Sequence, residues 1–286
     1  MAMTINTNVM SLNAQRNTIQ NSAAMATTLQ RLSSGLRVNS AKDDAAGLAI
    51  ATRMDTQVRG MNVAIRNAND GISLAQTAEA GMSTITDMLQ RMRELAVQAA
   101  NSTNTTGTGG DIDKLNDEYT QLGSEIQRSL GSVQFNGQTL LSGSTDYTFQ
   151  VGANSGSTQQ ITVTSGSLNL AGGVISAVFG TGTASGLSIN AHGTNASAVL
   201  GAIDDAISAV NTARAKLGAV QSRFENTINF LRSASENQSA AKGRIMDADF
   251  ASETANLSRT QILQQAGTAM IAQANQVPQN VLSLLR

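Results

Sequence analysis

Cysteine and tryptophan are absent from this chain, and proline and histidine occur once each. Without cysteine, disulfides and thiolate chemistry are excluded. A single histidine rules out a zinc site of the HExxH type, which needs two. No GxxxxGKS/T, GxGxxG or GxSxG sequence occurs, so the usual phosphate-binding loops and the serine nucleophile turn are missing too. The sequence therefore predicts no enzyme, no metal and no cofactor.

Aromatic residues are also scarce, at 3%, and charged residues make only 14% of the chain. Few large aromatics argue against one thick globular core, whereas the 41% of hydrophobic residues suit narrow seams between helices. The formal net charge of −1 gives no electrostatic reason to bind nucleic acid or an anionic membrane. No apolar run reaches about 18 residues, so no membrane span is predicted. The first residues lack a basic region followed by an apolar stretch, so no cleavable signal peptide is expected.

What is present is helical periodicity at both ends of the chain. Near the start, apolar residues recur at steps of three and four, which predicts an amphipathic helix with a narrow seam: Ile5, Val9, Leu12, Ile19, Leu29 and Leu32. The pattern breaks at 33–35 and 39–40. Asn39 or Ser40 is predicted to cap the next helix, with Asp43 and Asp44 in its first turn.

The next segment is the most regular of the chain. Apolar residues step by three or four from Met54 to Leu95, which predicts a long helix of coiled-coil type. The polar stretch 101–110 predicts a loop. A shorter helix from Ile112 to Leu130 is then expected to run antiparallel to the long one, because the connection is short.

Residues 132–195 form a Gly-, Ser- and Thr-rich insert with one charged residue, Asp146. Alternation over 147–151 and 161–163 predicts a β-hairpin. Weaker strands are predicted around Leu168 and Leu170, and around Leu187 and Ile189.

Helical periodicity resumes from 197 to 231 and is followed by a polar stretch at 233–242. The last segment carries a second stripe that includes Leu263, Met270, Val277, Val281 and Leu284. Pro278 lies within it and predicts a kink or a break. The acidic pairs Asp43/Asp44 and Asp247/Asp249 are interpreted as helix caps rather than catalytic carboxylates.

Helices with a single apolar stripe seldom hold together alone in water. The two terminal helices must pair with each other or with copies of themselves in other molecules. We expect both ends to become ordered on assembly. The alternative is a closed bundle in which the ends pair permanently within one molecule.

Several motifs resemble those of bacterial flagellins, in the same order along the chain. They are RLSSGLRVNSAKDDAAGLAI at 31–50, LQRMRELAVQ at 89–98, FNG at 135–137, LGAVQSRF at 217–224, QILQQAG at 261–267 and AQANQVPQNVLSLLR at 272–286. The resemblance implies a mainly α fold, with long antiparallel helices from both termini and a small β-hairpin region between them. Residues 1–44 and 243–286 then form the inner core helices, and residues 45–242 form a rod domain that includes the insert.

The resemblance also implies a function. The subunit polymerises into the extracellular flagellar filament used for swimming, after export in an unfolded state by the flagellar type III system. Expected partners are copies of itself, an export chaperone at the C-terminal segment, and the hook-junction and cap proteins. A Toll-like flagellin receptor is a further expected partner, with contacts at Gln90, Arg91, Leu95, Gln98 and Glu118. Leu122 departs from the arginine often found in the family, and Arg91 and Glu118 could instead simply pair across facing helices.

Three other interpretations remain open at this point. A hook–filament junction protein has similar ends and a similar export route. Some relatives carry catalytic inserts, although the insert here offers only His192 and Asp146 to build a site from. A generic coiled-coil scaffold would require the motif matches to be accidental.

Overall fold

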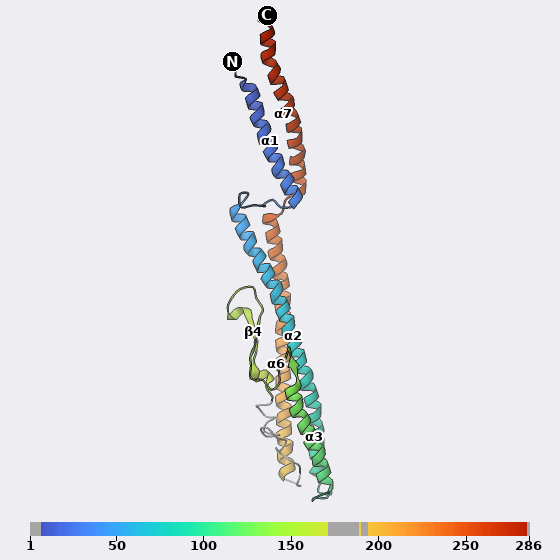
Figure 1. Cartoon of the computed structure of the whole chain (residues 1–286). Coiled ribbons are helices and arrows are strands. Elements are labelled where there is room, and N and C mark those ends of the chain that lie inside the picture. Colours follow the sequence, from blue (N-terminus) through green and yellow to red (C-terminus); the bar gives the residue numbers. More distant parts are fainter. Residues whose placement is uncertain (1–6, 171–188, 190–193, 285–286) are drawn as a thin grey trace. The chain divides into compact units, whose positions relative to one another are not determined.

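The computed structural model describes residues 7–170, 189 and 194–284, and the side chains of 194–196 and 277–284 are outside this description. The chain divides into two compact units. Unit 1 comprises residues 1–58 and 236–286, and unit 2 comprises residues 59–235. Helices α2 (Ala45–Ala99) and α6 (Thr194–Met246) contribute to both units. The mainly α fold class is confirmed (Figure 1).

In unit 1, helix α1 (Val9–Ser34) packs along helix α7 (Phe250–Leu284), and the two run in opposite directions (Figure 1). The Asn8 side chain caps the start of α1 by accepting a hydrogen bond from the Ser11 N–H at 3.1 Å. At its end, Gly35 adopts the left-handed conformation, with φ 71°, that closes a helix at low steric cost. Helix α7 continues through Pro278, so the predicted break there is wrong.

The segments that leave α1 and enter α7 pair with each other. Leu36 and Asp247 form an isolated antiparallel bridge, and the Ala248 N–H donates to the Gly35 carbonyl at 2.9 Å. Val38 is buried at 1% exposure. Asp249 then caps α7, since its Oδ1 accepts from the Ala251 N–H at 3.0 Å.

The start of α2 corrects a prediction. Asp44 caps this helix, because its Oδ1 accepts from the Gly47 N–H at 2.8 Å. Asn39 and Ser40 lie in the preceding loop instead, where their N–H groups donate to Asp43 Oδ2 at 3.2 and 2.9 Å. Asp43 thus shapes the loop, and the predicted cap was too early. Helix α2 therefore begins at Ala45, after the loop in which the Asp43 carboxylate accepts from the Asn39 and Ser40 N–H groups.

The polar stretch 233–242 is helical, since α6 continues through it to Met246. Side-chain contacts within unit 1 replace the missing apolar seam at this point. Lys242 Nζ donates to Asp55 Oδ1 at 2.5 Å, and the Gln238 amide donates to Gln57.

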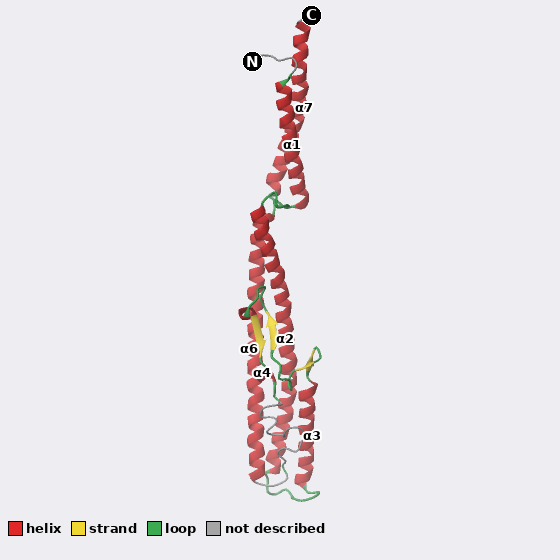
Figure 2. Ribbon diagram, turned by 60° about the vertical axis from the view of Figure 1, so that its left-hand side comes forward, coloured by secondary structure: helices red, strands yellow, loops and turns green. Residues whose placement is uncertain are grey.

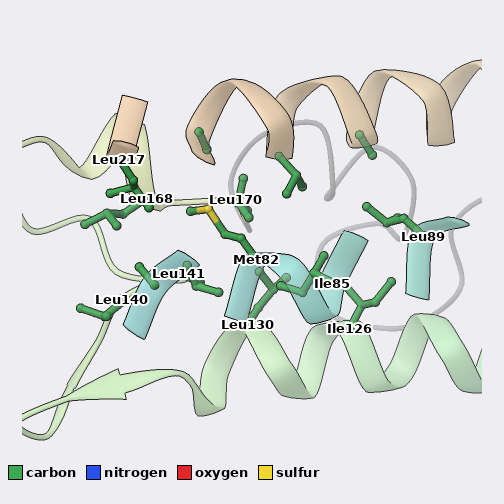
Figure 3. Close-up of a cluster of buried hydrophobic side chains, with 14 of the residues drawn as sticks. Met82, Ile85, Leu89, Ile126, Leu130, Leu140, Leu141, Leu168, Leu170 and Leu217 are labelled. Carbon is green, nitrogen blue, oxygen red and sulfur yellow. The ribbon is translucent and has the colours of Figure 1, made fainter. Parts of the chain in front are cut away.

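The core of unit 2 is a set of thin seams between helices. The apolar stripe of α2 meets α3 (Asp111–Ser132) on one side and α6 on the other, as Figure 3 shows for Met82, Ile85 and Leu89. Ile126 and Leu130 come from α3, and Ile203, Val210 and Leu217 are buried positions of α6. The predicted antiparallel arrangement of α2 and α3 is confirmed, since α3 starts beside the 100–110 loop and ends where Val133 meets Gly81.

Two antiparallel hairpins complete unit 2 (Figure 2). Strands β3 (Tyr147–Gln150) and β4 (Gln160–Val163) pair with Phe149 opposite Ile161, which confirms the predicted hairpin, and the 3-10 turn η1 (Ser157–Gln159) precedes β4. Strands β1 (Gln134–Phe135) and β2 (Gln138–Thr139) form a second hairpin that sequence reasoning missed. Its turn holds Asn136 at φ 50° and Gly137 at φ 75°, as an Asn-Gly hairpin turn requires.

The weaker strands predicted beyond the hairpin are not found among the described residues. Residues Ser165–Leu168 form a one-turn helix, α4, and the buried Leu168 and Leu170 face the core instead of pairing in a sheet. Ile189 is buried but belongs to no strand, and Leu187 lies outside the described residues.

Candidate assembly surfaces

The contact between α1 and α7 is lined mainly by small and polar residues. On α1, the buried and half-buried positions follow a heptad spacing: Ser11, Ala14, Thr18, Asn21, Met25, Thr28 and Leu32. On α7, the corresponding positions are Glu253, Leu257, Thr260, Gln264, Gly267, Ile271 and Ala274. We call these two sets together the inner seam. Few of these side chains are large and apolar, so the inner seam gains little from the hydrophobic effect.

Specific polar contacts set the register of the inner seam. The Asn8 amide donates to the Ala274 carbonyl at 2.7 Å at one end. Near the other end, Arg31 and Glu253 form an ion pair at 2.9 Å, and the Glu253 side chain is only 9% exposed. Between them the helices approach closely, since a Cβ added at Gly267 would lie 2.7 Å from Thr18 Oγ1. Glycine at this position therefore permits the approach.

The apolar stripe predicted from the sequence lies elsewhere on these helices. Val9, Leu12, Ile19 and Leu29 are 57%, 55%, 70% and 48% exposed, and Leu263 and Met270 are 43% and 60% exposed. We call these six residues the outer stripe. Of the other predicted seam residues, Leu32 is half-buried in the inner seam. Ile5 and the side chains of Val277, Val281 and Leu284 lie outside the described residues.

Heptad spacing explains why the outer stripe is continuous. Ile5, Leu12 and Ile19 are seven residues apart, as are Leu263, Met270, Val277 and Leu284. Seven residues make about two helical turns, so Leu12 and Ile19 lie on one line along α1, and Leu263 and Met270 lie on one line along α7. Leu12 and Ile19 each come one residue after an inner-seam position, Ser11 and Thr18. One residue is about 100° around a helix, so their side chains point away from α7. Among the described residues, Leu12, Ile19, Leu263 and Met270 remain 43–70% exposed, so much of their apolar surface is uncovered.

A second candidate surface lies on α2 and α3 in unit 2. Gln90, Arg91 and Gln98 are exposed on α2, and Glu118 is exposed on α3. Arg91 Nε donates to Glu118 Oε1 at 2.8 Å, and its NH1 group donates to Glu94 at 3.0 Å. The hydrogen bonds from Glu118 and then Glu94 raise the pKa of Arg91 above its ordinary value. The pairing of Arg91 with Glu118 across facing helices is therefore present.

Leu95 does not belong to that surface. It is 1% exposed and packs in the core between the helices of unit 2, because it occupies an inward position of the α2 heptad. The receptor contact that the resemblance implied at Leu95 therefore falls on a side chain that is buried in the free subunit. Val97, at 50% exposure, is the apolar side chain of α2 that reaches solvent here.

An ion pair beside this surface, between Arg93 and Asp204, could not be predicted from the sequence. Arg93 Nε donates to Asp204 Oδ1 at 2.7 Å, joining α2 to α6. This contact raises the pKa of Arg93, through the hydrogen bond and through the charge of Asp204. The two residues are 111 positions apart in the chain, so no local pattern links them.

The described residues contain no group of three His, Asp or Glu side chains that could hold a metal ion. His192 lies outside them. Asp146, the one charged residue of the insert, accepts a hydrogen bond from the Ser165 N–H at 2.6 Å and thereby starts α4. No helix within the described ranges has the length and apolarity needed to cross a membrane. The described residues thus present two exposed surfaces, the outer stripe on α1 and α7 and the polar patch on α2 and α3.

Comparison with known proteins agrees with that geometry. The bacterial flagellin N-terminal helical region matches residues 5–146, and the bacterial flagellin C-terminal helical region matches residues 200–285. A flagellin of Halalkalibacterium halodurans is 47% identical over 285 residues, covering 99% of this chain and all of the relative. A flagellar filament 33 kDa core protein of Treponema phagedenis is 40% identical over 305 residues, with 99% and 100% coverage.

A solved structure from Vibrio parahaemolyticus, assigned as a flagellar hook-associated protein, shares the fold alone. It is 14% identical with a TM-score of 0.55, and the match covers 72% of this chain and all of that one. Both terminal helical regions and nearly the whole length of the relatives are matched. This chain therefore belongs to the bacterial flagellin family, whose members are structural subunits of the extracellular flagellar filament.

Proposed function

We propose that this flagellin enters the filament through the outer stripe of α1 and α7, while the inner seam only sets how the two helices lie together. The observation that carries the proposal is the exposure of the outer stripe, 43–70%, beside an inner seam of mostly small and polar residues. Contacts of this kind join one face of a subunit to a different face of the next, so the assembly stays open and grows as a helical filament.

The expected energies fit this division of roles. Burying a Leu, Ile or Met side chain fully contributes about 1.5–3 kcal/mol. Because the six residues of the outer stripe are only 43–70% exposed, burying what remains contributes roughly 5–10 kcal/mol in total, which lies within the association cost of about 4–15 kcal/mol. The inner seam offers few such side chains. We infer that the terminal helices gain most of their stability on assembly, which couples their ordering to filament growth.

The test is elongation of filament seeds by purified subunits, followed by sedimentation and negative-stain imaging. Leu12→Ser with Ile19→Ser should stop elongation while the circular dichroism of unit 2 is kept. Gln20→Ser, at an exposed polar position next to Ile19, is the matched control and should elongate normally. A chain lacking residues 1–40 and 243–286 should stay monomeric. Normal elongation by the double Ser variant would contradict the proposal.

We also propose the division of the subunit that follows from this. Residues 1–44 and 243–286 supply the inner core of the filament, and residues 45–242 supply the rod around it. The concentration of the outer stripe on α1 and α7 supports this division. Limited proteolysis of seeds and free subunits tests it: cleavage within 9–34 and 250–276 should be slower in filaments, whereas the 100–110 loop should change less.

The exposed polar patch on α2 and α3 supports recognition by a Toll-like flagellin receptor, with Gln90, Arg91, Gln98 and Glu118 as contacts. Arg91 carries charge-assisted hydrogen bonds that an acidic or amide partner could share. Arg91→Ala should weaken binding to a purified receptor ectodomain. Arg128→Ala is the matched control, because Arg128 is an exposed arginine paired with Glu125 on α3. Equal loss in both variants would contradict this assignment.

Export by the flagellar type III system, with a chaperone on the C-terminal segment, completes the proposal. Support comes from the exposed Leu263 and Met270, which a chaperone would have to cover to prevent early polymerisation. The subunit would then follow the hook-junction proteins and add beneath the cap. Co-purification of a chaperone with the full chain, but not with a chain ending at 242, tests the first step.

The competing role is that of a hook–filament junction protein. Quantitative mass spectrometry of isolated filaments distinguishes the two. A bulk subunit is present in large excess over every junction protein, whereas a junction protein is present in a few copies per filament.

A further inference from the structure

The methionines of this chain fall into distinct classes of exposure. Met61, Met82 and Met92 are buried, at 6%, 0% and 0%. Met10 and Met270 are 64% and 60% exposed, and they are the only exposed methionines among the described residues. The rest of the described set is half-buried: Met25, Met54, Met88 and Met246.

Both exposed methionines lie on the terminal helices, next to the inner seam. Met10 directly precedes Ser11, and Met270 directly precedes Ile271. They lie towards the same end of the α1–α7 pair, where the Asn8 amide donates to the Ala274 carbonyl at 2.7 Å. Met270 belongs to the outer stripe. Met10 follows its member Val9 in the sequence but lies on another face of α1 than Leu12, about 160° around the helix.

We propose that Met10 and Met270 form an oxidation site that controls whether a free subunit can join the filament. The oxidant is a peroxide such as hydrogen peroxide. The thioether sulfur attacks one peroxide oxygen, the O–O bond breaks, and a sulfoxide and one water molecule form. The sulfur loses two electrons and the peroxide gains them. A dithiol-dependent methionine sulfoxide reductase reverses the step.

The effect on assembly follows from the polarity of the product. The sulfoxide oxygen is a strong hydrogen-bond acceptor, whereas the thioether sulfur is a weak one. Covering the sulfoxide of Met270 in the outer stripe, or that of Met10 beside it, with an apolar surface of another subunit buries an acceptor with no donor opposite it. The core methionines are shielded by their burial, so unit 2 keeps its fold while the assembly surface changes. The inference rests on the proposed role of the outer stripe.

The test oxidises folded free subunits with hydrogen peroxide, removes the peroxide and maps sulfoxides by peptide mass spectrometry. Met10 and Met270 should be converted before Met61, Met82 and Met92. The oxidised wild type should elongate seeds at least about tenfold more slowly, the factor expected for burial of unpaired acceptors. Treatment with a sulfoxide reductase should restore elongation.

Variants separate this site from the other methionines. Met10→Leu with Met270→Leu keeps apolar side chains at both positions and retains Met1, Met3 and Met25. After oxidation it should elongate at its unoxidised rate, whereas Met92→Leu, the control, should lose elongation as the wild type does. Equal loss in the double variant, or no preference for Met10 and Met270, would overturn the inference. Failure of unoxidised wild type to elongate seeds would instead contradict the proposed function.

Discussion

Phe224 packs between the β3–β4 hairpin and helix α2 in unit 2. It is 0% exposed and is one of only six phenylalanines in the chain. Its ring lies against Gly71 of α2, where an added Cβ would be 2.5 Å from Phe224 Cζ. The ring also meets Phe149 of β3 edge to face, with centroids 5.5 Å apart and planes at 88°. One residue of α6 thus contacts both a long helix and the hairpin.

Phe224→Ala should lower the free energy of unfolding of unit 2 by about 3–5 kcal/mol, the usual cost of removing a buried phenylalanine. Part of this loss belongs to the ring pair, which contributes about 0.5–1.5 kcal/mol beyond its buried area. Phe149→Ala and the double variant complete a double-mutant cycle that measures that part. Gly71 has no side chain that could move into the space that the ring vacates, so the cavity would not readily be filled from α2.

The assay is urea unfolding of the full chain followed by circular dichroism, with hydrogen exchange of the β3–β4 amides as a local readout. Phe230→Ala is the matched control, because Phe230 lies on the same helix and is 70% exposed. It should cost less than about 1 kcal/mol. If Phe224→Ala costs no more than Phe230→Ala, or the cycle shows no coupling with Phe149, the packing argument is refuted.

Three further predictions concern local structure. Asp44→Ala should cost about 1 kcal/mol by removing the cap of α2, measured by urea unfolding against Asp44→Ser, which keeps a capping oxygen. Gly137→Ala should cost about 1–2 kcal/mol, because alanine at φ 75° is strained, and hydrogen exchange should speed up in the β1–β2 hairpin. The hydrogen bonds from the Ser40 backbone and side chain, and then from Asn39, hold the pKa of Asp43 below its ordinary value. Because that pKa is lowered on folding, the loop contact is present above about pH 4 and is lost as the pH falls below it. Amide exchange at Ser40, corrected for intrinsic rates, should therefore be slower in the wild type than in Asp43→Asn at neutral pH, and the two rates should converge in acid.

Periodicity predicted the seams of unit 2 well, because each apolar position there packs within the subunit. Met82, Ile85 and Leu89 were placed on one stripe from their spacing alone, and all three are fully buried. The β3–β4 hairpin was predictable for a similar reason, since its alternation reflects one covered face. Leu95 shows the limit of transferring a role by motif, since its heptad position places it in the core.

Contacts between distant parts of the chain could not be predicted. Arg31 and Glu253 are 222 positions apart, and neither has a local pattern that favours pairing. The cap of α2 was misplaced because Asn39, Ser40, Asp43 and Asp44 are all good capping residues, and only the fold decides which carboxylate faces which N–H. The polar stretch 233–242 remained helical because Lys242 and Gln238 find partners on α2.

The stripe of α1 shows a different limit of the sequence. Its described residues are helical, as predicted, but most of them are exposed and do not form the contact with α7. The strongest hydrophobic periodicity of a chain marks its largest burial, and that burial can lie within the molecule or between molecules. In α1, Leu12 and Ile19 are exposed, and most positions of the seam within the subunit hold small or polar residues such as Ser11, Thr18 and Thr28. A closed bundle would place them the other way round, since burying leucine within the subunit stabilises it more than burying serine. Under the proposed role of the outer stripe, the reversed arrangement would favour growth by addition over closure of a single subunit. On that proposal, the terminal helices of the free subunit would be only marginally stable and would gain stability when a neighbouring subunit buries the outer stripe.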